Sequence, residues 1–166
     1  MRPILLATDD PNDVFTFWVH HKQCGVQNRV EVLSDGTDVI RYLKGDSVRC
    51  PVPALLVASL NMPKMGGLQL LERLLSEGHR DFASVLLIDA HCRDLKLVEP
   101  TEVGAASFLV RPMAKKDFCN IMSAHQTITM DGCQAGHDSN PTNNWLARRA
   151  GGGSLLFGRS EPDKSK

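Results

Sequence analysis

The sequence lacks an excess of charge of either sign. Its 166 residues contain 19 Lys and Arg against 19 Asp and Glu, so the formal net charge is zero. Proteins that bind nucleic acid or anionic membranes usually carry a basic patch or stripe, which shows in the overall charge balance. The composition therefore predicts neither nucleic-acid binding nor membrane binding.

Long apolar runs are absent as well. A membrane-spanning helix needs about 18 consecutive apolar residues, and no run in this sequence approaches that length. The apolar residues that follow Arg2 end at Thr8, where two aspartates begin, and this is not the pattern of a signal peptide. We therefore expect a cytoplasmic protein.

The cysteines show no spacing typical of a disulfide framework, and their number is odd. We interpret them as reduced thiols in a reducing compartment. His20 and Cys24 are four residues apart, as helical metal ligands can be, but no second pair stands nearby, so we predict no metal there. The five cysteines are Cys24, Cys50, Cys92, Cys119 and Cys133.

Recognisable catalytic motifs are missing too. We find no Gly-rich phosphate loop, no Walker-type motif and no locally supported Ser-His-Asp arrangement. The sequence therefore does not indicate an enzyme.

What the sequence does contain is an alternation of short apolar runs with longer amphipathic segments, typical of buried strands and of helices. Pro100 lies inside the fourth helical segment and predicts that this helix is short or distorted. Phe15 and Trp18, in the first helical segment, are predicted to lie in the core. Strands are expected at 4–7, 30–33, 55–58, 85–88 and 108–110, and helices at 14–24, 37–43, 68–77, 93–103 and 114–124.

Five such units in succession predict an α/β protein with a doubly wound five-stranded parallel sheet and helices on both faces. In such sheets the functional site lies at the carboxyl ends of the strands. Those ends carry residues 8–10 (Thr-Asp-Asp), Ser59, Asp89 and Arg111. From about residue 126 the pattern stops, so we predict a domain at 3–125 and a flexible tail at 126–166.

Three segments resemble response-regulator receiver domains of two-component signalling. Residues 4–13 (ILLATDDPND) resemble the opening of that family, residues 54–67 resemble its central stretch around LNMPKM, and residues 104–112 (GAASFLVRP) resemble its fifth-strand motif. The resemblance covers about residues 3–124, in the right order and spacing. It implies a flavodoxin-like fold with strand order 2-1-3-4-5.

The resemblance also implies a phosphoryl-accepting site, from which this sequence departs. In the family an aspartate at the end of the third strand accepts the phosphoryl group, and a Thr or Ser and then a Lys bind its oxygens. Ser59 stands at the acceptor position, Asp89 at the hydroxyl switch position and Arg111 at the lysine position. A serine hydroxyl is a poor nucleophile without a base, and Asp89 would repel a phosphoryl group.

The family's acidic pocket, which holds magnesium, is reduced to Asp9 and Asp10, preceded by Thr8 where an acidic residue is common. Binding of Mg²⁺ is possible but weakened, because Ser59 supplies no carboxylate; Asp10 is the candidate ligand. The alternative is an acidic pair that stabilises a helix N-terminus. For the other two departures we predict an ion pair in which Arg111 reaches towards Asp89, or towards Asp9 and Asp10.

The sequence thus predicts a pseudo-receiver that acts in a phosphorelay without being phosphorylated. Its expected partners are a histidine kinase, a phosphotransfer protein or another regulator. The alternatives are an atypical phosphoaccepting response regulator and, less favoured, a flavodoxin-like module that binds a small ligand.

Overall fold

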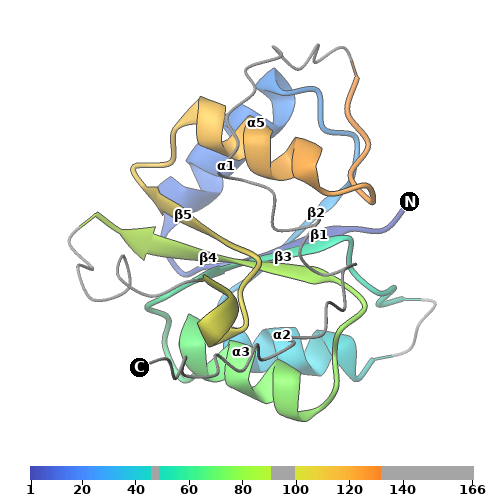
Figure 1. Cartoon of the computed structure of the whole chain (residues 1–166), viewed down its shortest axis with the longest axis vertical. Coiled ribbons are helices and arrows are strands. Elements are labelled where there is room, and N and C mark those ends of the chain that lie inside the picture. Colours follow the sequence, from blue (N-terminus) through green and yellow to red (C-terminus); the bar gives the residue numbers. More distant parts are fainter. Residues whose placement is uncertain (46–48, 91–99, 132–166) are drawn as a thin grey trace, which may run out of the picture. The chain divides into compact units, whose positions relative to one another are not determined.

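The computed structural model describes residues 1–45, 49–90 and 100–131 (Figure 1). In this part of the chain a parallel sheet has the strand order β2-β1-β3-β4-β5, so the predicted doubly wound α/β fold is confirmed. The strands are β1 (Ile4–Ala7), β2 (Val30–Leu33), β3 (Leu55–Ser59), β4 (Ala83–Asp89) and β5 (Ser107–Arg111). The helices are α1 (Pro11–Gln23), α2 (Gly36–Leu43), α3 (Gly67–Ser76) and α5 (Lys115–Ala124), with a 3-10 helix η1 (Pro100–Val103).

Helices cover both faces of the sheet. Helices α1 and α5 lie on one face, and α2 and α3 on the other (Figure 1). Successive strand residues point to opposite faces, so Ile4 and Leu6 join the core under α1 and α5, while Leu5 and Ala7 join the core under α2 and α3. Because both faces are buried, the central strands are continuous apolar runs. None of the helices in the described ranges is long and apolar enough to cross a bilayer.

The buried face of α1 differs from the prediction. Phe15 is 71% exposed and Trp18 is 37% exposed, so neither is a core residue. The core aromatic residue is Phe17, which is fully buried and packs edge-on against Phe118 of α5 with ring centroids 5.0 Å apart. Residues 13, 17 and 21, one turn apart, face inwards. The two aromatic residues Phe15 and Trp18 therefore lie on a different face of α1 from the one that Phe17 buries.

Packed structure continues beyond residue 125, where the sequence placed the end of the domain. Residues 126–131 run beside the segment before β2, with an antiparallel bridge between Val26 and Met130. Asn28 is fully buried; its side-chain amide donates to Thr127 O at 3.1 Å, and its Oδ1 accepts from Thr129 N at 2.7 Å. These buried amide bonds fix the segment together with Ile128 and Met130, which lie in the apolar core under α1 and α5 or pack against it. The rest of the predicted tail lies outside the described residues.

The predicted fourth helix falls mostly outside the described residues as well. Its described end is η1, which begins at Pro100. Proline suits a first helical position because it has no N–H to donate.

The interpretation of all cysteines as reduced thiols is wrong for two of them. Cys24 and Cys119 form a disulfide, and Cys50 is free. Cys24 caps the C-terminus of α1 and Cys119 lies in α5, so the packing of these two helices brings the sulfurs together. The two cysteines are 95 residues apart in sequence, and sequence spacing gives no indication of such a contact.

A buried carboxylate ties the loop after β3 to the start of α2. Asp35 is 1% exposed, and its Oδ1 accepts hydrogen bonds from the backbone N–H groups of Thr37 and Asp38. Lys64, in the loop, contacts the other oxygen at 2.9 Å. The bond from Lys64 and the two backbone bonds lower the pKa of Asp35, although burial opposes the shift. Asp35 thus fixes the loop that leads away from Ser59.

We expect Asp35→Ala to destabilise the fold by about 1–2 kcal/mol at neutral pH, because α2 loses its N-cap. The pKa of Asp35 is lower in the folded state than its unfolded value of 3.8, so this stability is fully present above pH 3.8 and is lost as pH falls through the folded-state pKa. Urea denaturation at several pH values should show a weaker acid dependence for the variant. Asp38→Ala is the control: Asp38 is half-buried in the first turn of the same helix and pairs with Arg41 but does not cap the helix, so its loss should cost no more than about 0.5 kcal/mol. Equal losses for both variants would contradict the assignment.

Candidate functional site

The candidate site lies at the carboxyl edge of the sheet, where β3, β4 and β5 end in polar residues. Asp89 and Arg111 are register partners on the neighbouring strands β4 and β5, so they leave the sheet side by side. Ser59 ends β3 and is 1% exposed. The parallel order of the strands thus brings together three of the residues that the sequence singled out.

The centre of this site is the guanidinium of Arg111. Its Nη1 donates to Asp89 Oδ1 at 3.2 Å, and its Nη2 donates to Ser59 Oγ at 2.7 Å. The predicted ion pair with Asp89 is therefore present. The shortest contact, however, goes to Asp13: Nη2 donates to Oδ2 at 2.6 Å, and Nε donates to Oδ1 of the same carboxylate at 2.9 Å. This two-pronged geometry is the strong form of an arginine–carboxylate pair.

Asp13 is the site residue that sequence reasoning missed. It lies in the first turn of α1, its side chain is 8% exposed, and its Oδ2 also accepts a hydrogen bond from Thr8 Oγ1 at 2.9 Å. The prediction directed Arg111 to Asp89, or to Asp9 and Asp10. The signal that could have identified Asp13 is its spacing of four residues from the core residue Phe17, which places both on the inward face of α1.

Asp10 and Asp9 have other surroundings. Asp10 is the N-cap of α1, because its side chain accepts from Asn12 N at 2.8 Å. This is the helix-start role that the sequence left open as the alternative to metal binding. Asp9 is exposed and lines a hollow with Leu60 and Asn61, whereas Asp10 lines a second hollow together with Asp13, Asp89 and Arg111. Neither aspartate is among the hydrogen-bond partners of Arg111 in the structure.

The charges around Arg111 balance in favour of its cationic form. The hydrogen bonding of Arg111 to Asp13 is the largest influence that raises the pKa of Arg111; partial burial opposes it, and Asp89 adds to the rise. The Ser59 hydroxyl accepts from Arg111 and donates to the backbone oxygen of Asn61 at 2.9 Å. Its proton is therefore directed to a carbonyl group and not to a base.

No family model matches the chain. Solved structures do resemble it. The bacteriophytochrome response regulator RtBRR is 25% identical, with 90% of this chain and 89% of that chain covered and a TM-score of 0.65. The bacteriophytochrome response regulator AtBRR is 28% identical over 74% of this chain and 91% of that chain, with a TM-score of 0.60. A response regulator in red light signalling of R. palustris is 21% identical over 75% and 90%, with a TM-score of 0.63.

The described domain has the receiver fold. Its structural neighbours are response-regulator receiver domains, and they support a place in two-component signalling. In this receiver fold the ends of β3, β4 and β5 hold Ser59, Asp89 and Arg111, where the family resemblance places an aspartate, a hydroxyl residue and a lysine.

The magnesium ion that such domains use does not fit the residues of this receiver fold. Mg²⁺ requires oxygen ligands in near-octahedral geometry. Here Asp13 is bound by the Arg111 guanidinium, Asp10 caps a helix, and Ser59 takes the place of a carboxylate. Among the described residues, no group of three or more His, Cys, Asp or Glu side chains is arranged to hold a metal ion. The cation at the centre of this pocket is the guanidinium itself.

The two carboxylate partners of Arg111 should differ in their effect on stability. The side chain of Asp13 is 8% exposed and that of Asp89 is 43% exposed. We expect Asp13→Asn to lower the free energy of unfolding by about 2–3 kcal/mol, since it leaves a mostly buried cation without its main partner.

Asp89→Asn is the matched control, and it should cost less than about 1 kcal/mol because water screens an exposed pair. Urea denaturation at neutral pH measures both variants. A loss for Asp89→Asn as large as that for Asp13→Asn would show that Asp13 is not the principal partner of Arg111.

Proposed function

We propose that this chain is a phosphorylation-independent pseudo-receiver that acts in two-component signalling by binding a partner protein. The observation that carries the proposal is the Arg111 guanidinium, which contacts Asp13, Ser59 and Asp89 at once. These residues come from α1, β3 and β4. One permanent cation therefore joins the ends of elements that, in the family it resembles, surround the phosphoryl group.

The chemistry at β3 supports the absence of phosphorylation. A phosphoryl acceptor needs an activated nucleophile, whereas Ser59 is buried, unionised at neutral pH and hydrogen-bonded at its oxygen by Arg111. An incoming phosphoryl group would also meet the carboxylates of Asp13 and Asp89. To bind Arg111 it would have to displace Asp13 from a mostly buried, two-pronged contact.

The same geometry supports a single conformational state. Receiver domains switch when a newly bound phosphoryl group draws the residue at the end of β4 towards the end of β3. In this chain Arg111 already holds Asp89 and Ser59, at 3.2 and 2.7 Å. A ligand shifts an equilibrium only if it binds two states unequally, and here the contacts that would distinguish the states are permanent. The carboxyl edge of the sheet therefore presents one surface to a partner.

The comparisons support a class of partner for this proposal. Two structural neighbours, at 25% and 28% identity, are bacteriophytochrome response regulators. This favours a histidine kinase of a sensory receptor as the partner; a phosphotransfer protein or another regulator are the other candidates. We assign the protein no enzymatic role, and we propose that its output goes through protein contacts.

Incubation with acetyl phosphate and Mg²⁺, followed by intact mass spectrometry, tests the pocket. We expect no phosphoryl adduct on the protein and almost none on Ser59→Asp, because Arg111 would bind the new carboxylate. Ser59→Asp combined with Asp89→Thr and Arg111→Lys should accept clearly more, since it restores all three family positions. If the single variant is phosphorylated as well as the triple variant, the locked-pocket proposal fails.

Ser59→Ala is the matched control for the unaltered protein. A phosphoryl adduct that appears on the unaltered protein and disappears in Ser59→Ala would establish the rival reading, an atypical phosphoaccepting regulator. An adduct that survives in Ser59→Ala would lie outside this pocket.

A binding titration tests the second half of the proposal. The dimerisation and phosphotransfer domain of the candidate kinase is titrated with this protein by calorimetry, with and without acetyl phosphate and Mg²⁺. We expect the same Kd under both conditions, because the pocket has one charge state. A Kd that changes tenfold or more on addition of acetyl phosphate would contradict phosphorylation-independent binding.

A further inference from the structure

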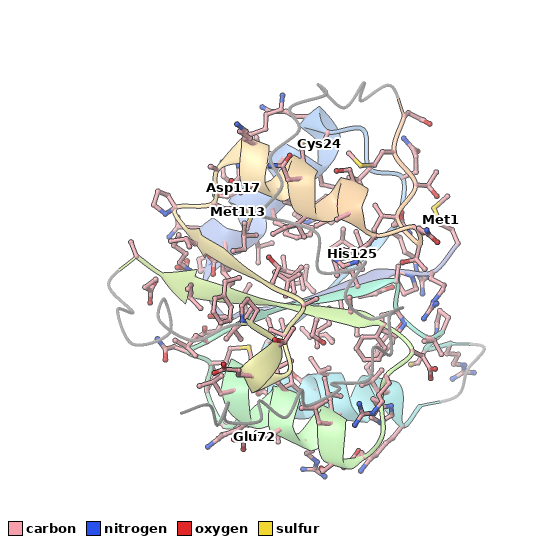
Figure 2. The ribbon with its side chains drawn as sticks, viewed as in Figure 1. Met1, Cys24, Glu72, Met113, Asp117 and His125 are labelled. Atoms are coloured by element: carbon pink, nitrogen blue, oxygen red, sulfur yellow. A yellow bond between two sulfur atoms is a disulfide. The ribbon has the colours of Figure 1, made fainter. Side chains whose placement is uncertain are left out.

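A disulfide joins the two helices on one face of the sheet. Cys24 is the C-cap of α1, and it bonds to Cys119 in α5 (Figure 2). The Cα atoms are 5.9 Å apart, within the usual range for a disulfide. Cys24 belongs to the core cluster under α1 and α5, and Cys119 packs against it. The bond is therefore compatible with the packing of these helices.

This disulfide is one of three ties between α1 and the segment that runs from the end of β5 into α5. At the carboxyl edge of the sheet, Asp13 of α1 holds Arg111. Further along α1, the His20 ring contacts the backbone oxygen of Met113 through Nε2 at 2.8 Å. The disulfide comes last, at the C-terminal end of α1. The three ties follow the length of α1, and the disulfide is the covalent one, so thiol–disulfide exchange can make or break it.

We propose that Cys24 and Cys119 are a reversible dithiol–disulfide pair, whose redox state sets how firmly α1 and α5 are joined and thereby gives this domain a regulatory input. The pair lies outside the Arg111 cluster. A test of the redox proposal therefore gives a result that does not depend on whether Ser59 can be phosphorylated.

The exposure of the two cysteines determines which thiol reacts first in thiol–disulfide exchange. Cys24 is 1% exposed, whereas Cys119 is partly exposed. A low-molecular-weight disulfide, such as oxidised glutathione, is the oxidant. The Cys119 thiolate attacks one of its sulfurs, which forms a mixed disulfide and releases one small thiol. The Cys24 thiolate then attacks the Cys119 sulfur and releases the second small thiol. Two protein thiols are oxidised and one small disulfide is reduced to two thiols, so the step balances.

Opening the bond should affect one face of the sheet. Cys24 precedes Val26, which bridges to Met130, and both belong to the core under α1 and α5 or pack against it. Reduction therefore removes a constraint on α1, α5 and residues 126–131 together. The helices on the opposite face, α2 and α3, pack in a separate cluster and should be unaffected. A partner that contacts α5 or residues 126–131 would sense the difference.

The experiment uses the full chain with Cys50, Cys92 and Cys133 replaced by Ser, so that only the proposed pair can react. The protein is equilibrated in buffers of reduced and oxidised glutathione, and free thiols are trapped by alkylation and counted by mass. We expect conversion between zero and two free thiols across these buffers. The Tm should fall by on the order of 10 °C in the reduced form, because a cross-link across a long loop is lost. Hydrogen exchange should rise in peptides covering 11–24 and 115–131, and stay unchanged in those covering 36–43 and 67–76.

Cys24→Ala combined with Cys119→Ala is the control, and its Tm should match that of the reduced form in every buffer. If this variant does not fold, the Tm and hydrogen exchange of the reduced protein can still be compared with those of the oxidised protein. Three results would overturn the proposal: the reduced pair does not re-form the bond, the bond resists every glutathione buffer, or the bond forms and breaks without a change in Tm and in hydrogen exchange.

Discussion

The ion pair between Arg111 and Asp13 is the contact on which the carboxyl edge of this sheet depends. A guanidinium whose side chain is 19% exposed must find partners for its donors. It finds them on α1, β3 and β4. Because the cation is shared, a change at any partner alters the surroundings of the others, so Asp13, Ser59, Asp89 and Arg111 are best understood as one unit. The arrangement also explains why a serine is tolerated at the end of β3: the Arg111 charge is balanced from α1.

A fixed cation and a transient phosphoryl group place different demands on the same fold. The phosphoryl group supplies a contact that exists in one conformation of a receiver domain and not in the other. This difference shifts the equilibrium between the two conformations. Arg111 supplies its contacts permanently, and its charge does not change over the physiological pH range, because neighbouring carboxylates raise a pKa that is already high. The sheet and helices of the receiver fold are present, and under our proposal the end of β3 has one chemical state instead of two.

The sheet could be predicted from the sequence because buried parallel strands appear as continuous apolar runs. The expected strand order then determines which strand-end residues lie next to one another. That logic correctly paired Asp89 with Arg111. It did not reach Asp13, because Phe15 and Trp18 suggested the wrong buried face for α1. It did not reach the Cys24–Cys119 contact either, since helix packing and not local pattern creates it. Residues 126–131 were missed because their two core-packing residues, Ile128 and Met130, form too short a pattern to predict a packed segment, and the hydrogen bonds to the buried Asn28 amide join residues far apart in the sequence.

The permanence of the Arg111 cluster restricts where a signal can enter this domain. An input at the carboxyl edge would have to separate a mostly buried cation from its carboxylate, which is costly because the charge left behind has no partner. Helix α1 carries that edge contact in its first turn and the disulfide at its other end. A disulfide can be opened without leaving a buried charge, because both products are neutral thiols. A redox change at Cys119 therefore acts on α1 and α5 while the contacts of Arg111 stay intact. The carboxyl edge of the sheet then keeps one structure while the packing of α1 and α5 can change.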